Sequence, residues 1–146
     1  MNTTNQPHPA PEPLEDFWGD PLDIYTRTQA LEDGVLVDVS ELAREYGIIY
    51  PVAITRAAWE DTCDWTPADD ARKRTGTGQS AAGRTWDVLT MFKHAARRGG
   101  SEIIFQVLRI PREGTGTRPK LATLKALCGP GDNAEPVITI MHPDED

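Results

Sequence analysis

The sequence predicts a two-layer α+β domain, in which helices pack on an antiparallel sheet that ends in a three-stranded meander. A long helical pattern runs from Ser80 to Arg98, with apolar residues at spacings of three and four. Three β-rich segments follow it, at Glu102–Ile110, Lys120–Cys128 and Val137–Met141. Their connections are short, which suits antiparallel neighbours. Shorter helical and β-like segments come before the long helix.

The first third of the domain is expected to contain short helices and one clear strand. A β-branched, apolar run over Val35–Val39 predicts the strand. It lies between helices expected at Ile24–Asp33 and at Ser40–Tyr46, the second capped by the hydroxyl of its first serine. The apolar segment Ile48–Ile54 is a connector or an edge strand, because the proline inside it cannot donate to a ladder. A helix is expected over Arg56–Trp65, with the preceding threonine as its N-cap.

The segment 66–79 carries charges of both signs and no periodicity, which predicts a mobile loop. The helix after it has a regular apolar spacing. We expect its buried face to be made by Ala82, Trp86, Leu89, Phe92, Ala95 and Ala96.

The chain of 146 residues has the length of one ordinary domain. Residues 1–19 are predicted to be a disordered, Pro-rich acidic tail, residues 20–142 a single α+β domain, and residues 143–146 an acidic C-terminal tail. The chain contains no run of about 18 apolar residues and its start does not resemble a signal peptide. We therefore expect a cytoplasmic protein with no membrane contact, whose two cysteines are reduced.

The net charge of −8 hides an acidic–basic–acidic order along the chain. Residues 1–70 carry 15 acidic and 3 basic side chains, residues 71–131 carry 12 basic and 3 acidic ones, and residues 132–146 carry 5 acidic ones and no basic one. Two arrangements follow from this order. The segments neutralise each other across the folded surface, or they form like-signed surfaces that attract partners.

Like-signed surfaces would give two candidate binding sites. An acidic face on two helices would imitate nucleic acid and attract a basic cleft; its residues would be Asp38, Glu41, Glu45, Glu60, Asp61 and Asp64. A basic patch would neutralise phosphates of a nucleic acid, although a pI of about 4.8 opposes long-range attraction. Its residues would be Arg72, Lys73, Arg74, Lys93, Arg97, Arg98, Arg112 and Arg118.

The sequence offers little support for chemistry. Cys128 precedes a Gly- and Pro-rich turn, and His94 or His142 could complete a nucleophilic set, but neither a nucleophile elbow nor a spacing signal is present. The cysteines and histidines have none of the spacings of zinc sites. A Gly-Thr-Gly step before the long helix lacks the other residues of a P-loop. We therefore expect no catalytic residue, no metal and no cofactor.

Several runs resemble an uncharacterised family of small proteins carried by bacterial phages, plasmids and integrated mobile elements. The resemblance covers residues of about 24–142, in order. It rests on Leu31–Ser40, Ala43–Glu45 with Gly47, Tyr50–Ala53, Thr55–Ala57 with Trp59, Gly83–Leu89, Leu124–Lys125, Cys128–Asn133 and Glu135–Met141. The resemblance implies a genomic setting and brings no catalytic residue with it.

That setting and the charge order favour a binding protein that acts by protein–protein interaction on a host complex. The complex would be a defence or nucleic-acid-processing machine, as for anti-CRISPR proteins and other anti-defence proteins. One alternative is a nucleic-acid-associated accessory protein that uses the basic region 72–125. Another is a small hydrolase or transferase. The sequence predicts neither the identity of the partner nor the oligomeric state.

Overall fold

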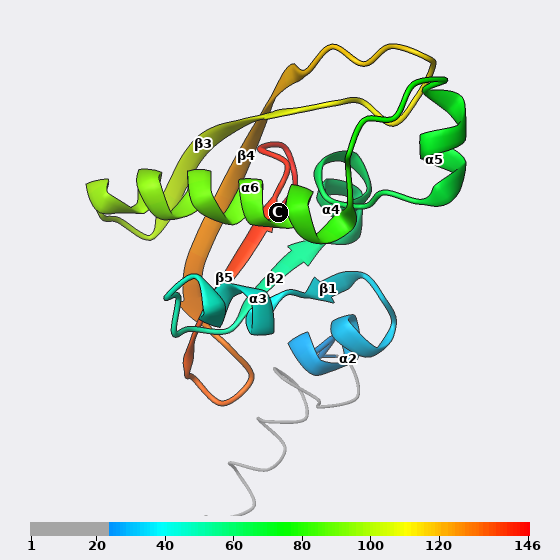
Figure 1. Cartoon of the computed structure of the whole chain (residues 1–146). Helices are drawn as coiled ribbons and strands as arrows, with labels where there is room; N and C mark the ends of the chain where they lie inside the picture. The colour runs from blue at the N-terminus through cyan, green and yellow to red at the C-terminus, as the bar shows by residue number, and fades with distance from the viewer. Residues whose placement is uncertain (1–23) are drawn as a thin grey trace, which may run out of the picture.

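The computed structural model describes residues 24–146, which form one five-stranded sheet with helices packed against it (Figure 1). The strand order is β1-β2-β5-β4-β3. Strands β3, β4 and β5 form an antiparallel meander, which confirms the predicted C-terminal arrangement. The proposed tail at residues 1–19 lies outside the described residues. The strands span Leu36–Asp38 (β1), Val52–Thr55 (β2), Glu102–Arg109 (β3), Lys120–Pro130 (β4) and Pro136–Met141 (β5).

Strand β2 lies inside the sheet, so its prediction as an edge strand is wrong. It pairs antiparallel with β1 and parallel with β5, and this parallel pair is absent from the sequence prediction. Pro51 is compatible with the interior position because it precedes the strand, and its carbonyl accepts the Ile138 amide at 2.9 Å. The long segment between β2 and β5, which contains α6, allows the crossover that a parallel pair requires.

Short helices begin at side chains that accept backbone amides. Thr26, Thr55, Thr66 and Ser80 each accept the amide three residues later, which confirms the predicted cap at Thr55. Ser40 is no cap: its hydroxyl accepts the Val52 amide at 2.9 Å and so ties a helix to β2. The helices are α2 (Arg27–Glu32), α3 (Ser40–Glu45), α4 (Arg56–Thr62), α5 (Pro67–Arg72) and α6 (Ala81–Ala95), with the 3-10 helix η3 at Ala96–Arg98.

Helix α5 lies in the segment that was predicted to be a mobile loop, and that prediction is wrong. Thr66 and Asp69 form a capping box, in which each side chain accepts the backbone amide of the other residue. Pro67 occupies the first turn, where its missing N–H has no cost. The sequence Thr-Pro-Ala-Asp is typical of a capped helix start, although the charged residues around it show no helical periodicity.

The buried face of α6 is rotated from the predicted one. Its buried residues are Arg84, Thr85, Val88, Leu89, Phe92 and Ala95. Ala82 is exposed, and Trp86 is 36 % exposed and packs on Tyr46 with ring centroids 4.6 Å apart. The predicted face followed the apolar spacing alone and so left out two polar residues. The burial of these two residues turns the buried face of α6. Arg84 and Thr85 are buried because the two terminal nitrogens of Arg84 and the hydroxyl of Thr85 donate to backbone carbonyls.

The core lies between one face of the sheet and helices α3, α4 and α6. Ile54, Leu124 and Ile140 on the sheet and Leu89 on α6 are fully buried in it. Helix α2 lies on the other face, where Arg27 donates to the Thr139 hydroxyl at 2.6 Å and contacts the carbonyl of Ile138. The two faces are therefore covered unequally, and part of the second face stays open.

Candidate functional site

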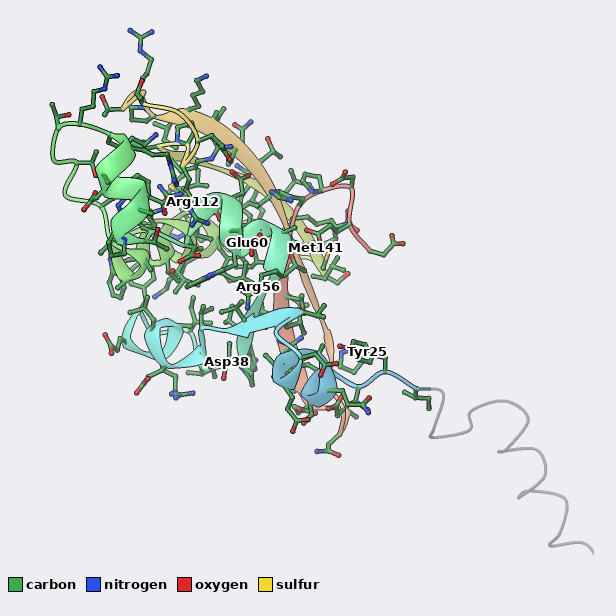
Figure 2. All side chains as sticks on the ribbon, turned by 90° about the vertical axis from the view of Figure 1, so that its right-hand side faces the viewer. Tyr25, Asp38, Arg56, Glu60, Arg112 and Met141 are labelled. Carbon is green, nitrogen blue, oxygen red and sulfur yellow. The ribbon has the colours of Figure 1, made fainter. Side chains whose placement is uncertain are left out.

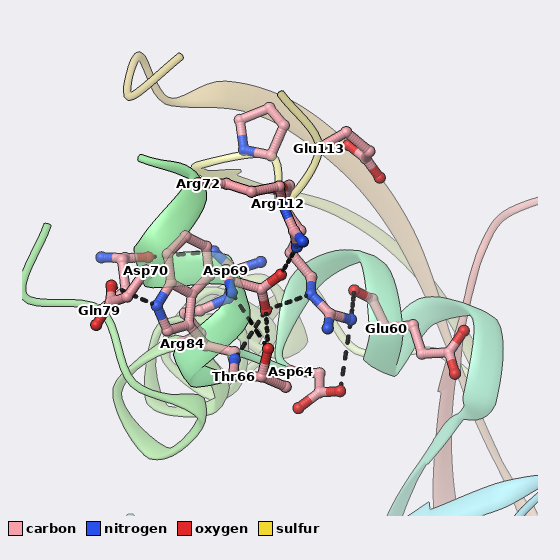
Figure 3. Close-up of polar contacts among 12 residues, drawn as sticks. Glu60, Asp64, Thr66, Asp69, Asp70, Arg72, Gln79, Arg84, Arg112 and Glu113 are labelled. Carbon is pink, nitrogen blue, oxygen red and sulfur yellow. Dashed lines mark hydrogen bonds and ion pairs between the residues drawn. The ribbon is translucent and has the colours of Figure 1, made fainter. Parts of the chain in front are cut away.

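The predicted acidic and basic residues meet with opposite signs interleaved. Their meeting point is the loop 110–119 between β3 and β4, which lies beside α5 (Figure 1). Asp69 of α5 is fully buried, accepts Arg112 Nε at 2.8 Å and forms a second ion pair with Arg72. Asp64 pairs with Arg112 at 3.4 Å (Figure 3). We call Asp64, Asp69, Arg72 and Arg112 the Asp69 cluster.

Asp69 carries a negative charge inside the protein. Burial raises the pKa of its carboxyl, but the Thr66 amide and hydroxyl and the Arg112 guanidinium outweigh burial and hold the pKa below its usual value. The carboxylate is therefore ionised at neutral pH. Its partners are polar on every side, as a buried charge requires. The Asp69 cluster thus fastens the β3–β4 loop to α5.

Two buried cations hold the same loop through its backbone. Lys73 is 1 % exposed and donates to the carbonyls of Pro111, Glu113 and Gly114 at 2.6, 3.1 and 3.2 Å. Arg84 is 3 % exposed and donates to the carbonyls of Ile110 at 2.9 Å and Asp61 at 3.0 Å. Its guanidinium also donates to Gln79 and lies 4.9 Å from the Trp65 ring centroid, so both cations are already used in holding the fold.

A second ionic group joins α4 to the C-terminal end. Asp61 accepts Arg109 Nε at 2.9 Å and contacts His142 Nε2 at 3.0 Å. Burial raises the pKa of Asp61, but the hydrogen bonds from Arg109 and His142 outweigh burial and leave the pKa below its usual value. Glu145 accepts the Thr55 hydroxyl at 2.8 Å, and the carbonyl of Glu145 accepts Lys125 at 2.7 Å. Residues 142–145 therefore pack against the domain.

The six predicted acidic residues do not form one surface. Asp61 and Asp64 are paired with arginines, and the Glu60 carbonyl accepts Arg112. The remaining three, Asp38, Glu41 and Glu45, are exposed around α3, and within residues 24–146 none of them forms an ion pair. Figure 2 shows Asp38 below Glu60 and Arg112 and separated from them.

The predicted basic patch is divided in the same way. Lys73 is buried, and Arg72 and Arg112 are paired with Asp69, whereas Arg74 and Arg118 are exposed near the β3–β4 loop. The other three basic residues lie at the opposite end of α6, a helix of 15 residues and so about 22 Å long. These three are Lys93, Arg97 and Arg98, of which Lys93 donates to the Tyr46 carbonyl at 2.7 Å.

The two cysteine thiols are poorly activated as nucleophiles. Burial raises the pKa of the Cys63 thiol and of the Cys128 thiol, which lowers the thiolate fraction at neutral pH. His142 contacts Asp61 and Glu145. Across the part of the chain that the structure describes, no three His, Cys, Asp or Glu side chains gather as a metal site, and no helix is long and apolar enough to cross a bilayer.

Sequence reasoning missed an apolar surface on the sheet. Strand β3 is an edge strand, and its side chains alternate between the core and the face opposite α6. Ile104 is 47 % exposed on that face, Leu108 is 61 % exposed, and Leu121 of β4, directly opposite Leu108, is 56 % exposed. We call this surface the open β3–β4 face; it consists of Ile104, Gln106, Leu108, Leu121 and Thr123. The sequence indicates this surface, because apolar residues occupy both the odd and the even positions of Glu102–Ile110 and so both faces of the strand.

Comparison with known proteins places the chain in a family. Neither a curated protein nor a solved structure matches it. One family profile matches residues 17–146, and so includes every described element of the fold. The resemblance to an uncharacterised family is confirmed to that extent. The chain therefore belongs to DUF6573, a family of unknown function.

Proposed function

We propose that this protein is a binding protein that acts by protein–protein contact and receives an extended segment of its partner along β3. The observation that carries the proposal is the eight-residue edge strand β3, with apolar side chains exposed on the open β3–β4 face. An edge strand offers unpaired backbone groups, and an extended segment can satisfy them by joining the sheet. Exposed side chains on the same face then supply contact area and selectivity.

The apolar contribution can be estimated from exposure. Ile104, Leu108 and Leu121 are each about half exposed. Full burial of such a side chain is worth about 1.5–3 kcal/mol, so covering the exposed halves of all three contributes on the order of 3 kcal/mol. The main-chain bonds of an added strand supply specificity of register. Together they suit a partner of moderate affinity with further contacts elsewhere.

The charged residues support binding over catalysis. The carboxylates and arginines of the Asp69 cluster pair with each other, and Lys73 and the terminal nitrogens of Arg84 donate to backbone carbonyls, including those of the β3–β4 loop. Raised thiol pKa values make Cys63 and Cys128 weak nucleophiles. The polar groups that a hydrolase or transferase would need are therefore engaged in structural contacts.

The three exposed carboxylates on and beside α3 favour a partner with a basic surface. Asp38, Glu41 and Glu45 would raise the rate of association with such a surface, in a manner sensitive to salt. The resemblance to proteins of phages, plasmids and integrated elements makes a host defence or nucleic-acid-processing complex the natural partner. Inhibition of that complex, as by an anti-CRISPR protein, is the activity we propose.

Site-specific photocrosslinking in a bacterial host extract tests the contact surface. A photoreactive residue replaces Thr123, which is exposed on the open β3–β4 face, and in a matched control it replaces Ala71, which is exposed on α5. We expect a discrete host-protein adduct from position 123 only, and its loss when Leu108→Lys is added. Equal adducts at both positions, or an adduct that persists with Leu108→Lys, would contradict the proposal.

A second candidate function is contact with nucleic acid at the β3–β4 loop. Arg74 and Arg118 favour it, because both are exposed and neither forms an ion pair within residues 24–146. The net charge of −8 opposes it. A gel shift at low salt should show a complex that weakens with Arg118→Ala. A chain that shifts no probe at low salt excludes this candidate.

A further inference from the structure

The free side of β3 can be read from the hydrogen-bond alternation. The Cys128 amide donates to the Ser101 carbonyl at 2.8 Å, one step beyond the β3–β4 register. In an antiparallel pair every second residue bonds to its neighbour strand. The odd-numbered residues of β3 therefore bond β4, and the N–H and C=O groups of Ile104, Gln106 and Leu108 point away from it. Within residues 24–146 no strand pairs with that side.

Helix α6 runs along the inner face of β3 and leaves two hollows beside it. One has a volume of about 320 Å³ and is lined by Met91, His94 and Arg98 together with Ile104 and Gln106. Figure 1 shows α6 lying across β3 and β4. We call the free edge of β3, with α6 beside it, the channel.

The other hollow lies further along β3, toward the β3–β4 loop. It has a volume of about 180 Å³, and its lining includes Arg84, Asp87, Leu108 and Ile110. Arg84 donates to the carbonyl of Ile110 at 2.9 Å and so closes the channel at that end. Asp87 thus stands beside Leu108, as His94 and Arg98 stand beside Ile104 in the first hollow.

We infer that the channel takes the β3 strand of a second copy of this chain, in an antiparallel pairing about a two-fold axis at Gln106. The two sheets then continue into one. This inference rests on the proposed strand addition at β3 and names a second copy as the occupant of that edge when no host segment is bound. The outward backbone groups belong to even-numbered residues, so a two-fold axis at Gln106 brings bonding groups face to face on both strands.

Side chains of the open β3–β4 face match in this register. Ile104 lies opposite Leu108 of the second copy, and Leu121 extends the apolar row on the far side of Leu108. Gln106 lies opposite itself, with Thr123 beside it on β4. Cross-strand pairs of this kind are the units that stabilise a sheet. The apolar row occurs twice in the dimer, as an isologous interface requires.

The charges along α6 match as well. Asp87 lies in the hollow that Leu108 lines, while His94 and Arg98 lie in the hollow that Ile104 lines. Because Leu108 pairs with Ile104 of the second copy, Asp87 faces His94 and Arg98 of that copy. The opposite signs meet twice across the axis. This self-complementarity favours a second copy as the occupant of the edge in the isolated protein.

Sedimentation over a range of protein concentrations tests the inference with Gln106→Pro. Proline lacks the N–H that the second copy would use, and at this even position no bond to β4 is lost. The matched control Gln106→Ala keeps the N–H. We expect dimers for the natural chain and Gln106→Ala, and a dissociation constant about 30-fold higher for Gln106→Pro, which loses two symmetry-related hydrogen bonds.

Charge exchange and hydrogen exchange provide independent measurements. Asp87→Arg and Arg98→Asp should each weaken the dimer, and the double variant should recover it. In the unsubstituted chain, protection of the Ile104, Gln106 and Leu108 amides should rise with protein concentration. A chain that is monomeric at every concentration overturns the inference, as does equal dimerisation of Gln106→Pro and Gln106→Ala.

The inference and the proposed function fail in different ways. A monomeric chain whose crosslink from position 123 to a host protein disappears with Gln106→Pro overturns the second copy as occupant and keeps strand addition. A chain for which Gln106→Pro changes neither the oligomeric state nor the crosslink overturns both.

Discussion

Replacing Asp69 by Asn tests whether the buried carboxylate holds the β3–β4 loop. Asn keeps the shape of the side chain and removes its charge, which leaves Arg72 and Arg112 without their shared partner. Breaking a buried ion pair costs about 3–5 kcal/mol. The side chain of Arg72 is 46 % exposed and can regain water, so we expect a loss at the lower end, about 3 kcal/mol. That is a large share of the ~5–15 kcal/mol that a domain holds.

The effect should depend on pH in a defined direction. The folded-state pKa of Asp69 is lowered from 3.8, so its contribution is present above that value and is lost as pH falls through the folded-state pKa. Urea unfolding at neutral and acid pH measures this, with Asp70→Asn as control, because the Asp70 oxygen that accepts the Trp65 indole is retained as an amide oxygen. A destabilisation that is equal at both pH values, or equal for Asp70→Asn, would refute the reasoning.

Three further predictions concern the same fold. Lys73→Met should lower the free energy of unfolding in urea by about 2–3 kcal/mol, because three carbonyls of the loop lose a charged donor. The exposed control Lys120→Met should change it by less than about 0.5 kcal/mol. Equal losses for the two variants would contradict the role of Lys73 in holding the loop. Thr66→Ala should cost about 1 kcal/mol through loss of the α5 cap, measured by thermal melting, and an unchanged melting curve would contradict the cap. At neutral pH a thiol reagent should modify Cys128 more slowly than it modifies a free cysteine peptide, and it should modify Cys63 only when the protein unfolds. Fast labelling of either thiol would contradict the raised pKa values.

The sequence by itself determined the elements whose signals are local. The long helix from Ser80, the cap at Thr55 and the three C-terminal strands could all be predicted, because spacing, cap residues and β-branched runs act within a few residues. The cap of α5 at Thr66 was also local and was missed among charges. The absence of an apolar segment long enough to span a membrane was equally visible from composition.

Tertiary structure alone decided which charges remain available and which strand edge stays free. Asp69 meets Arg112, and Arg84 meets the carbonyl of Ile110, across long separations in sequence, and no local pattern encodes such pairings. The position of β2 between β1 and β5 likewise depends on pairing between segments that lie far apart in the sequence. An arginine lies in the core when distant carbonyls accept its terminal nitrogens, and a leucine such as Leu108 stays exposed when no helix covers its part of the sheet. Both outcomes depend on three-dimensional neighbours, which the order of residues specifies only through the complete fold.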